Sequence, residues 1–497
     1  MPLHTPPEDR SPGRPGTEQI PAPVESAQLT LVEQLVQWGR RRIEERVFRP
    51  GMRMPSIRRL AIDKGVSRFT VVEAYERLVA QGYLDSRRGS GFYVREPAST
   101  LSPAPRVAAA VGHAIDVVWL LRNMIGTTSP EKGPGLGYLP NRWLDGELIA
   151  NSLRALGRQG GAQLLQLGTP QGFYPLRQQL QMRLSELEIA ASPEQIVMTS
   201  GVTQALDLIA RLYVQPGDTV LVGDPAWFQM FGRFASQGAR LVGVPYTRDG
   251  PDLDALERLV IEWKPRMLVL NTVLHNPTGT SLGAAQAFRI LKIAEEHDLI
   301  VVEDDIYSDL ATPTSTTSRL ASLDQLKRVI YLGSFSKTLA ANLRVGFAAC
   351  SPEVARALTD QKMLVGMTSP EINERVVFKI LTEGHYRRHT ERLRNRLDAV
   401  RERTARALEK IGFRLFASPG HGMFHWADTG VDTAVLTAAG HEAGYLLAPG
   451  ALFSPNQSPS TWMRFNIANC GDPGLMDFLG RALDRGAERA VPVPVAG

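Results

Sequence analysis

Short apolar runs alternate with helical stretches through most of the chain beyond about residue 135, and this alternation constrains the fold more than any other feature. Alternating buried strands and helices predict an α/β domain with a parallel sheet. From about Ser351 the pattern becomes helical, so we expect a smaller C-terminal α+β subdomain. The expected strands are residues 196–200, 219–224, 267–273, 299–305, 329–334 and 346–350.

A different pattern, of short helices followed by a hairpin, occupies residues 31–94. The spacing of apolar residues predicts a first helix from about Leu31, and Ser56 and Ser67 are the expected N-caps of a second and a third. The segment 83–94 is a basic hairpin that contains glycine. Helices followed by such a hairpin predict a winged helix-turn-helix. In the third helix we expect a buried stripe of Val71, Ala74, Tyr75 and Leu78.

The 497 residues are too many for one ordinary domain. Both ends of the winged segment adjoin stretches rich in Pro, Ala and Ser, which is typical of leaders and linkers. We predict a disordered leader at 1–26, the winged domain at 27–95, a linker at 96–113 and a large domain at 114–497, divided into subdomains at about 135–350 and about 351–490.

Positive charge is concentrated in the winged segment. Residues 31–94 hold 13 Lys and Arg against 7 Asp and Glu, a local charge of +6, so the remaining residues carry −1 of the total of +5. Local basic charge favours nucleic-acid binding.

Cys350 and Cys470 are the only cysteines, and they are too few for a disulfide framework or a cysteine-based zinc site. We therefore expect no metal and a reducing cytoplasm. No run of about 18 apolar residues occurs, and the first residues lack the apolar core of a signal peptide. We therefore predict no membrane association.

Basic and hydroxyl side chains cluster where a recognition helix would meet DNA. Arg58 and Arg68 are the best candidates for contacts with DNA. At the start of the third helix Arg68 could bind a guanine, and Thr70 could touch a base methyl or a phosphate. Arg87 and Arg88 form the tip of the wing, where they would reach the backbone or the minor groove. Any one of these arginines is equally explained as part of a solvated basic face. The segment MPSIRRLAIDKGVSRFTVVEAYERLVAQGYLDSRRGSGFYV closely resembles the GntR family of bacterial regulators. That resemblance implies DNA contacts at Ser56, Arg58, Ser67, Arg68, Thr70 and Gly89.

The large domain carries a set of residues suited to pyridoxal phosphate. This cofactor requires a lysine amine, an anion at the pyridine nitrogen, donors around the phosphate and an aromatic ring over its own ring. Lys337 follows the expected strand 329–334, at the strand end where α/β sheets hold ligands, and we predict it as the Schiff-base lysine with a lowered pKa. Ser334 and Arg344 flank it with groups that bind phosphate.

Four further segments supply the rest of that set. The loop before the helix at 204–214 offers Gly201, Val202 and Thr203 to the same phosphate. Trp227, after the strand 219–224, is predicted to lie across the cofactor ring. In the segment 303–307, Asp304 is assigned to the pyridine nitrogen and Asp305 is interpreted as a solvated acid. Tyr307 of this segment and Asn276 of the segment HNPTGT are assigned to the phenolic oxygen.

These elements, in this order, resemble fold-type I aminotransferases from about Gly135 to the C-terminus. The resemblance implies that Arg464 in TWMRFNIAN holds a substrate or effector carboxylate. A GntR-type reader followed by such a domain is similar to the MocR subfamily, as is the spacing of seven residues from Lys337 to Arg344. The chain departs from that pattern at Leu167, where relatives usually have a tyrosine that reaches a cofactor phosphate across the dimer.

Three functions follow from this reading. The favoured one is a cytoplasmic, nucleoid-associated transcription regulator that senses pyridoxal phosphate or a small amino compound through an imine on Lys337. The resemblance implies a head-to-tail homodimer, and hence paired half-sites in double-stranded DNA. The alternatives are a working aminotransferase with a DNA-binding appendage, and a DNA-binding protein whose large domain is an inert dimerisation scaffold.

Overall fold

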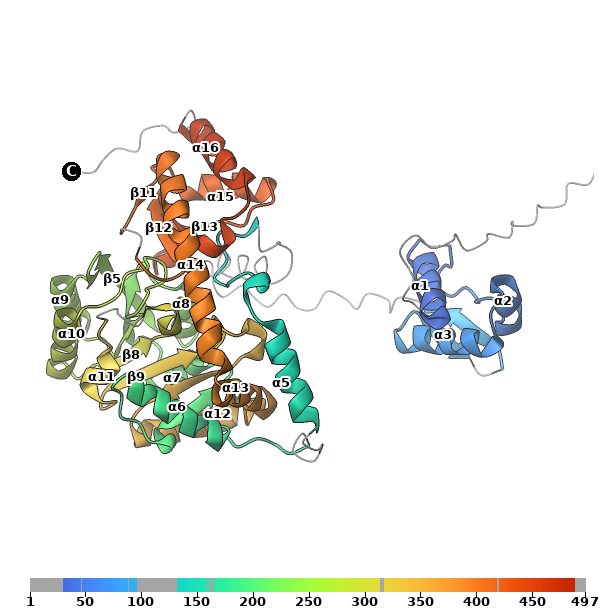
Figure 1. Cartoon of the computed structure of the whole chain (residues 1–497), viewed down its shortest axis with the longest axis horizontal. Coiled ribbons are helices and arrows are strands. Elements are labelled where there is room, and N and C mark those ends of the chain that lie inside the picture. Colours follow the sequence, from blue (N-terminus) through green and yellow to red (C-terminus); the bar gives the residue numbers. More distant parts are fainter. Residues whose placement is uncertain are drawn as a thin grey trace, which may run out of the picture. The chain divides into compact units, whose positions relative to one another are not determined.

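The structure is a computed structural model, in which contacts divide the chain into two compact units, Met1–Ala110 and Val111–Gly497 (Figure 1). The predicted leader at 1–26 and linker at 96–113 lie outside the described residues. Within the described part of the chain, no helix is both long and apolar enough to cross a membrane. The described residues are 30–45, 47–87, 89–95, 132–158, 161, 165–312, 317–417 and 420–487.

The N-terminal unit consists of helices followed by a hairpin, as the sequence predicts. Ser56 and Ser67 cap α2 and α3 through their side chains. The predicted stripe of α3 is fully buried and packs with Leu60 and Leu84 in one core. Gly65, in the turn between α2 and α3, has φ of 65°, a left-handed conformation that favours glycine. The elements are α1 (Leu31–Glu44), α2 (Ile57–Lys64), α3 (Arg68–Ala80), β1 (Leu84–Arg87) and β2 (Gly91–Val94).

The C-terminal unit contains a large sheet of eight strands among its described residues. Strands β5, β4, β7, β8 and β9 run parallel to one another in that order across the sheet. The strands are β3 (Ile196–Thr199), β4 (Thr219–Asp224), β5 (Arg240–Thr247), β6 (Gly250–Pro251), β7 (Met267–Leu270), β8 (Ile300–Asp304), β9 (Val329–Ser334) and β10 (Gly346–Ala349), in the order β3-β10-β9-β8-β7-β4-β5-β6.

The sheet is mixed, so the prediction of a parallel sheet is wrong for β10, next to one edge, and for β6, which pairs antiparallel with β5 at the other edge. β10 pairs antiparallel with both β9 and β3. The segment 335–345, which joins β9 to β10, holds only a turn and a short 3-10 helix. It is too short for the helical crossover that a parallel neighbour needs, so the chain reverses direction.

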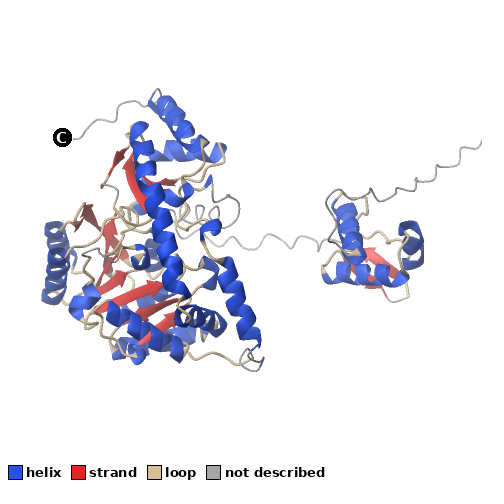
Figure 2. Ribbon diagram, viewed as in Figure 1, coloured by secondary structure: helices blue, strands red, loops and turns tan. Residues whose placement is uncertain are grey.

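Helices cover both faces of this sheet (Figure 2). Along β4, Val220 and Val222 enter one core with α7 and α8, whereas Leu221 enters the other core with α6, α9, α10 and α13. This alternation is the two-residue period of a strand buried on both faces. The helices are α5 (Gly146–Arg158), α6 (Tyr174–Glu186), α7 (Val202–Tyr213), α8 (Phe228–Ala235), α9 (Leu253–Trp263), α10 (Ala284–Glu296), α11 (Leu320–Asp324), α12 (Pro352–Gly366) and α13 (Glu371–Thr382).

A smaller α+β region follows, as the sequence predicts, although α12 and α13, which lie beyond the predicted start at about residue 351, still pack with helices of the large sheet. Four strands of the described chain form an antiparallel sheet in the order β11-β12-β14-β13. The long helix α14 packs against β11, and α15 packs against α16. The elements are α14 (His385–Lys410), β11 (Arg414–Leu415), β12 (Phe424–Asp428), α15 (Thr433–Glu442), β13 (Ala448–Pro449), β14 (Trp462–Asn466) and α16 (Gly474–Ala487).

Candidate functional sites

Lys337 lies in the turn after β9, at the carboxyl end of the parallel strands, and it is buried. Its Nζ atom donates a hydrogen bond to the carbonyl oxygen of Gly137 at 2.8 Å and lies 4.1 Å from the ring centre of Tyr138. Burial, and then the positive charges of Arg464 and Arg344, lower the pKa of the amine to about 7. A large fraction of this lysine is therefore neutral and nucleophilic near neutral pH.

Asp304 ends β8, the strand beside β9, and is buried. Its Oδ1 atom has no hydrogen-bond partner among the described residues. Burial and the adjacent Asp305 raise the pKa of its carboxyl to about 7. Asn271 fixes its position, because Asn271 Nδ2 donates to the Asp304 carbonyl at 2.7 Å and Asn271 Oδ1 accepts from the amide of Asn276 at 2.7 Å. The Asn271 side chain thus ties the backbone at Asp304 to that at Asn276.

Asn276, Tyr307 and Arg464 form one buried chain of hydrogen bonds. Asn276 Nδ2 donates to the Tyr307 hydroxyl at 3.1 Å, and Arg464 Nη1 donates to Asn276 Oδ1 at 2.8 Å. Arg464 also donates to the carbonyl of Gly135 at 2.6 Å, and its guanidinium lies 4.5 Å from the ring centre of Phe424. Within the described chain the Nε atom of Arg464 has no hydrogen-bond partner. A buried guanidinium with a spare donor suits a carboxylate.

The loop between β3 and α7 presents the start of a helix to the same region. Gly201 has φ of 79°, and Val202 and Thr203 begin α7. Arg344 donates to the carbonyl of Ser200 at 2.8 Å, and a Cβ atom on Gly201 would lie 2.8 Å from its guanidinium. The helix N-terminus and the arginine therefore lie close together, and only glycine fits between them.

Ser334 and Ser336 add hydroxyl groups on the turn that carries Lys337. Ser334 Oγ donates to Ser336 Oγ at 3.1 Å and accepts from the Ser336 amide at 3.1 Å. With Arg344 and the start of α7, these groups form a cluster of donors suited to a phosphate.

Trp227 lies between β4 and α8 and is half-buried against the main core. Its placement over a cofactor ring stays a prediction. An aromatic stack lies next to Asn276 in the chain: the rings of Tyr246 and His275 are stacked with their centroids 4.0 Å apart. Burial lowers the pKa of His275 to about 3, so this ring is neutral.

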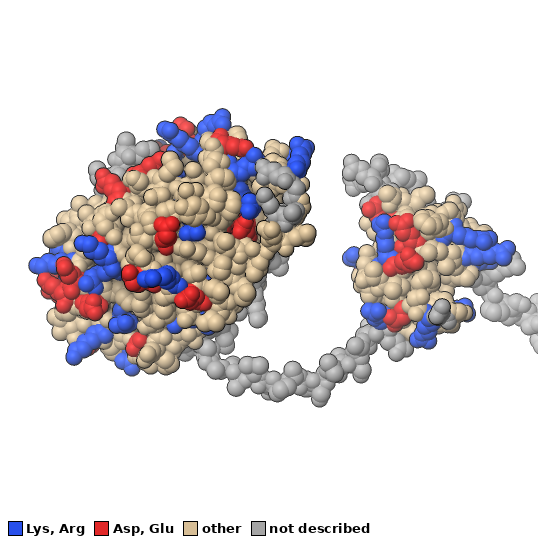
Figure 3. All heavy atoms as spheres, turned by 90° about the horizontal axis from the view of Figure 1, so that it is seen from below, with Lys and Arg blue, Asp and Glu red and all other residues tan. Residues whose placement is uncertain are grey.

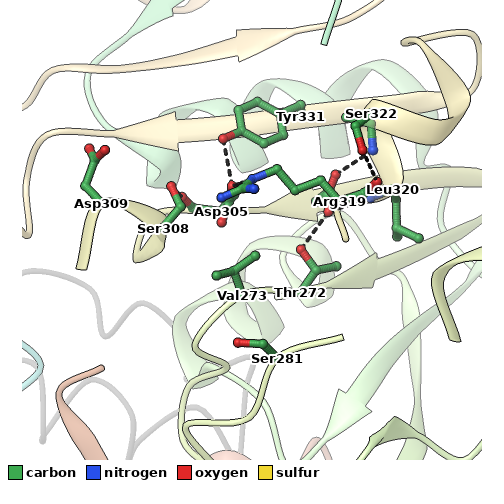
Figure 4. Close-up of polar contacts among 12 residues, drawn as sticks. Thr272, Val273, Ser281, Asp305, Ser308, Asp309, Arg319, Leu320, Ser322 and Tyr331 are labelled. Carbon is green, nitrogen blue, oxygen red and sulfur yellow. Dashed lines mark hydrogen bonds and ion pairs between the residues drawn. The ribbon is translucent and has the colours of Figure 1, made fainter. Parts of the chain in front are cut away.

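Asp305 is not the solvated acid that the sequence suggested, and this interpretation was wrong. It is buried, and its carboxylate accepts from Arg319 Nε at 2.6 Å and from the Tyr331 hydroxyl at 2.8 Å (Figure 4). Figure 4 also shows Thr272, whose hydroxyl donates to Glu303 at 2.6 Å. Alternate residues of a strand face opposite sides of a sheet, so the side chains of Glu303 and Asp305 lie on the face opposite to that of Asp304. Because both carboxyl groups are buried, they need these hydrogen bonds and the ion pair with Arg319.

The buried groups fit pyridoxal phosphate. A neutral lysine amine, an orphaned carboxylate oxygen, an amide and phenol pair, and a cluster of phosphate donors lie on neighbouring turns at the carboxyl end of one sheet. Three of the four interactions that the cofactor needs, the amine, the anion and the phosphate donors, are thus present, and the amide and phenol pair adds partners for its phenolic oxygen. The predicted residues Lys337, Asp304, Asn276, Tyr307 and Arg464 are linked by hydrogen bonds and close charges, while their roles toward a ligand remain predictions.

The described residues predicted to read DNA lie on the surface of the N-terminal unit. Arg58 and Arg68 are exposed, and the Arg87 guanidinium lies 4.3 Å from the ring centre of Tyr93. Gly89 has φ of 75°, as a tight wing turn requires, and Arg88 lies outside the described residues. Figure 3 shows acidic side chains between the basic ones on the visible face of this unit.

The serine hydroxyls predicted to contact DNA are engaged within the domain. Ser56 Oγ accepts from the amide of Arg59 at 3.2 Å, and Ser67 Oγ accepts from the amide of Thr70 at 3.0 Å. Ser67 Oγ also lies 2.7 Å from Thr70 Oγ1. These hydroxyls cap helices and position the side chains next to them.

Sequence reasoning missed the residues that support the site. Gly137 and Tyr138 contact Lys337, and Asn466 Nδ2 donates to the carbonyls of Leu136 and Tyr138 at 2.9 and 2.8 Å. The glycine-rich stretch 133–138 was the available signal, because glycine marks close backbone approach. Nothing local to Asn271 or Arg319 marks them, since their partners lie far away in sequence.

Each of the two units contains a region that matches a known protein family. Residues 145–481 match the family described as aminotransferase class I and II, and residues 31–94 match the gntR family of bacterial regulatory proteins. The chain therefore belongs to the aminotransferase class I and II family, with a gntR-family region fused before it. This is the architecture of MocR-like regulators.

Three similar proteins illustrate the range of relatives. The uncharacterized HTH-type transcriptional regulator YdcR of Escherichia coli is 27% identical, over 88% of this chain and 94% of that protein. The probable rhizopine catabolism regulatory protein MocR of Rhizobium meliloti is 30% identical, over 72% of each chain. The structure of LysN, an α-aminoadipate aminotransferase from Thermus thermophilus in complex with N-(5'-phosphopyridoxyl)-L-leucine, aligns with a TM-score of 0.68 and 28% identity, over 75% of this chain and 96% of that one.

Proposed function

We propose that this chain is a transcription regulator that binds pyridoxal phosphate at Lys337 and changes its DNA binding when the cofactor or a small amino compound occupies the site. The observation that carries the proposal is the buried lysine with a pKa of about 7, beside the orphaned oxygen of Asp304. These groups occur in one chain with a gntR-family region. When bound, pyridoxal phosphate supplies an aldehyde that reacts with amines and a ring that withdraws electrons from them.

Each residue of the set has a distinct task. Lys337 attaches the cofactor covalently through its neutral amine. Asp304, as an anion, holds the proton on the pyridine nitrogen, and that ion pair favours its charged form. Asn276 and Tyr307 bind the phenolic oxygen. Ser334, Arg344 and the start of α7, with Gly201, Val202 and Thr203, hold the phosphate, and Trp227 covers the ring.

Arg464 is proposed to bind the effector carboxylate. It donates to Asn276 and to a backbone carbonyl, both neutral acceptors. A carboxylate would make a stronger, charge-assisted pair with the same guanidinium and would use its spare Nε donor. An amino acid is therefore the expected class of amino compound.

The DNA contacts are assigned to Arg58, Arg68, Arg87, Arg88 and Gly89, with Ser56, Ser67 and Thr70 at the helix starts. We further propose a head-to-tail homodimer, paired half-sites in the DNA, and a cytoplasmic, nucleoid-associated location. We also propose the domain limits expected from the sequence, with a leader at 1–26, the winged domain at 27–95, a linker at 96–113 and the large domain at 114–497. Leu167, which is 69% exposed, replaces the tyrosine expected to reach the partner's cofactor phosphate, so this contact is absent from the proposed site.

Binding of a selected operator, measured on the full chain, tests the function. The duplex is first selected from a random pool. Affinity is then measured with the cofactor-free protein, with added pyridoxal phosphate, and with a panel of amino acids. The proposal expects a cofactor-dependent shift that is lost in Lys337→Ala. Unchanged affinity under all conditions would contradict it.

A second candidate function is a working aminotransferase that carries a DNA reader. The observation that favours it is the hydrogen-bonded connection from Arg464 through Asn276 to Tyr307, which reaches from the carboxylate site to the cofactor site. Transamination requires Lys337 to move a proton between two carbons. Stoichiometric pyridoxamine phosphate after addition of an amino acid, with recovery on addition of a keto acid, would favour this candidate.

A further inference from the structure

Phe69, the second residue of α3, is 76% exposed. Its ring belongs neither to the core of the N-terminal unit nor to the apolar side chains packed against that core. Single exposed apolar residues are common on protein surfaces and do not by themselves indicate a function. Phe69, however, lies in the first turn of the helix expected to read DNA, where an exposed ring can contact a base.

Phe69 lies on the face of α3 that points away from the core. Val71, Ala74, Tyr75 and Leu78 are buried and form one stripe. At 100° per residue, position 69 lies nearly opposite the centre of that stripe. The ring therefore projects where a duplex would meet the helix.

The charges along this outer face restrict which end of α3 can approach a duplex. The first turn contains no acid and includes Arg68. Glu73, which pairs with Arg77 at 2.8 Å, and the exposed Glu76 lie farther along the helix. Phosphates repel these acids and are attracted to the positive end of the helix dipole, so α3 would enter the groove by its first turn.

The side chains at the start of α3 differ in what they can offer to a base edge. The hydroxyls of Ser67 and Thr70 lie 2.7 Å apart, and Ser67 caps the helix. Arg68 and Phe69 remain exposed. Arg68 suits a guanine, whereas the ring of Phe69 carries no hydrogen-bond donor.

We propose that Phe69 packs against the 5-methyl group of a thymine in the major groove of each half-site, and so sets the operator sequence that this chain prefers. The thymine methyl is the apolar group that base edges present in that groove. The inference rests on the proposed DNA-binding function and goes beyond it, because it assigns a base preference to one side chain.

Replacement of thymine by uracil tests this contact, because it removes the methyl group and leaves every hydrogen bond of the pair unchanged. The full chain first selects its operator from a random duplex pool, and each thymine of a half-site is then replaced in turn. We expect one position at which the substitution weakens binding about fourfold, the effect of one buried methyl group. Phe69→Ala should bind the thymine and uracil duplexes equally, while Phe69→Leu should keep part of the difference.

Ile62→Ala is the matched control, because Ile62 is 70% exposed on α2 and should keep the full difference. A wild-type chain that binds its operator but tolerates uracil at every position would overturn the inference alone. Phe69→Ala that still discriminates thymine from uracil would also overturn it. A wild-type chain that retains no duplex would overturn the DNA-binding function as well.

Discussion

The N-terminal and C-terminal units place the side chains proposed to bind their ligands in opposite environments. In the N-terminal unit Arg58, Arg68 and Phe69 are exposed. In the C-terminal unit Lys337 and Arg464 are buried and tied to partners from distant segments. The proposed DNA contacts can therefore change with the DNA target at little cost to folding, whereas the groups of the proposed cofactor site lie inside their unit, where changes of size or charge also affect packing.

Both units have ion pairs on the surface, and the C-terminal unit also has a buried one. The pairs of the N-terminal unit, such as Arg40 with Glu44 and Arg77 with Glu73, lie on its surface. In the C-terminal unit Arg319 and Asp305 are paired with side chains 12% and 0% exposed. Surface pairs contribute little to stability, while removing one partner of a buried pair leaves an uncompensated charge.

The largest effect is expected at Lys337. Lys337→Ala removes the amine that attaches the cofactor, so the absorption band of the attached cofactor should disappear completely while the chain stays folded. Lys362 is the matched control, because it is also buried and burial lowers its pKa to about 8. A band that survives in Lys337→Ala and disappears in Lys362→Met would reassign the attachment site.

Arg319→Met should destabilise the C-terminal unit by about 3–5 kcal/mol, because Asp305 is left buried without its cation. Urea unfolding followed by a signal from this unit measures the change. Arg289→Met disrupts the exposed pair with Asp254 and should cost less than about 1 kcal/mol. Equal costs for the two variants would remove the contrast between buried and surface pairs.

Asp304→Asn should weaken retention of pyridoxal phosphate about 10- to 100-fold, because the amide cannot form a charge-assisted hydrogen bond with the protonated ring nitrogen. Equilibrium dialysis gives the dissociation constant. Asp298→Asn, on a carboxylate whose side chain is 93% exposed, should retain the cofactor like the wild type. Equal retention by Asp304→Asn would assign the ring nitrogen to another group.

The rate of cofactor attachment should depend on pH with a midpoint near 7. Because the pKa of Lys337 is lowered to about 7, the neutral amine is the main form above that pH and falls tenfold per unit below it. Stopped-flow absorbance of cofactor-free protein mixed with pyridoxal phosphate measures the rate, with N-acetyl-lysine as the reference amine. A rate that keeps rising from pH 7 to pH 9, as for the reference, would contradict the lowered pKa.

The smallest effect is expected in the N-terminal unit. Ser67→Ala removes the side-chain cap of α3 and should cost about 1 kcal/mol. In a domain of this size that corresponds to a melting temperature lower by about 4–8 °C. Calorimetry of the full chain measures the shift in the transition of the N-terminal unit. A Ser67→Ala chain that melts like the wild type would contradict the capping role of Ser67.

Local patterns predicted the parts of the molecule that depend on neighbours in sequence. The caps at Ser56 and Ser67 and the buried stripe of α3 follow from short-range spacing, and so do the strand ends that carry Asp304 and Lys337. The antiparallel direction of β10 does not follow from such spacing, because its direction relative to β9 depends on the length of the connection between the two strands. The burial of Asp305 depends on Arg319 and Tyr331, which local sequence does not place beside it.

The central claim is that the cofactor site and the DNA reader are energetically coupled, and reciprocity tests it most directly. If pyridoxal phosphate changes operator affinity by some factor, the operator must change cofactor affinity by the same factor. We would measure the dissociation constant of pyridoxal phosphate for the full chain with and without saturating operator. The account predicts a change of about 5- to 150-fold that matches the change in operator affinity. An identical constant in both conditions would contradict it.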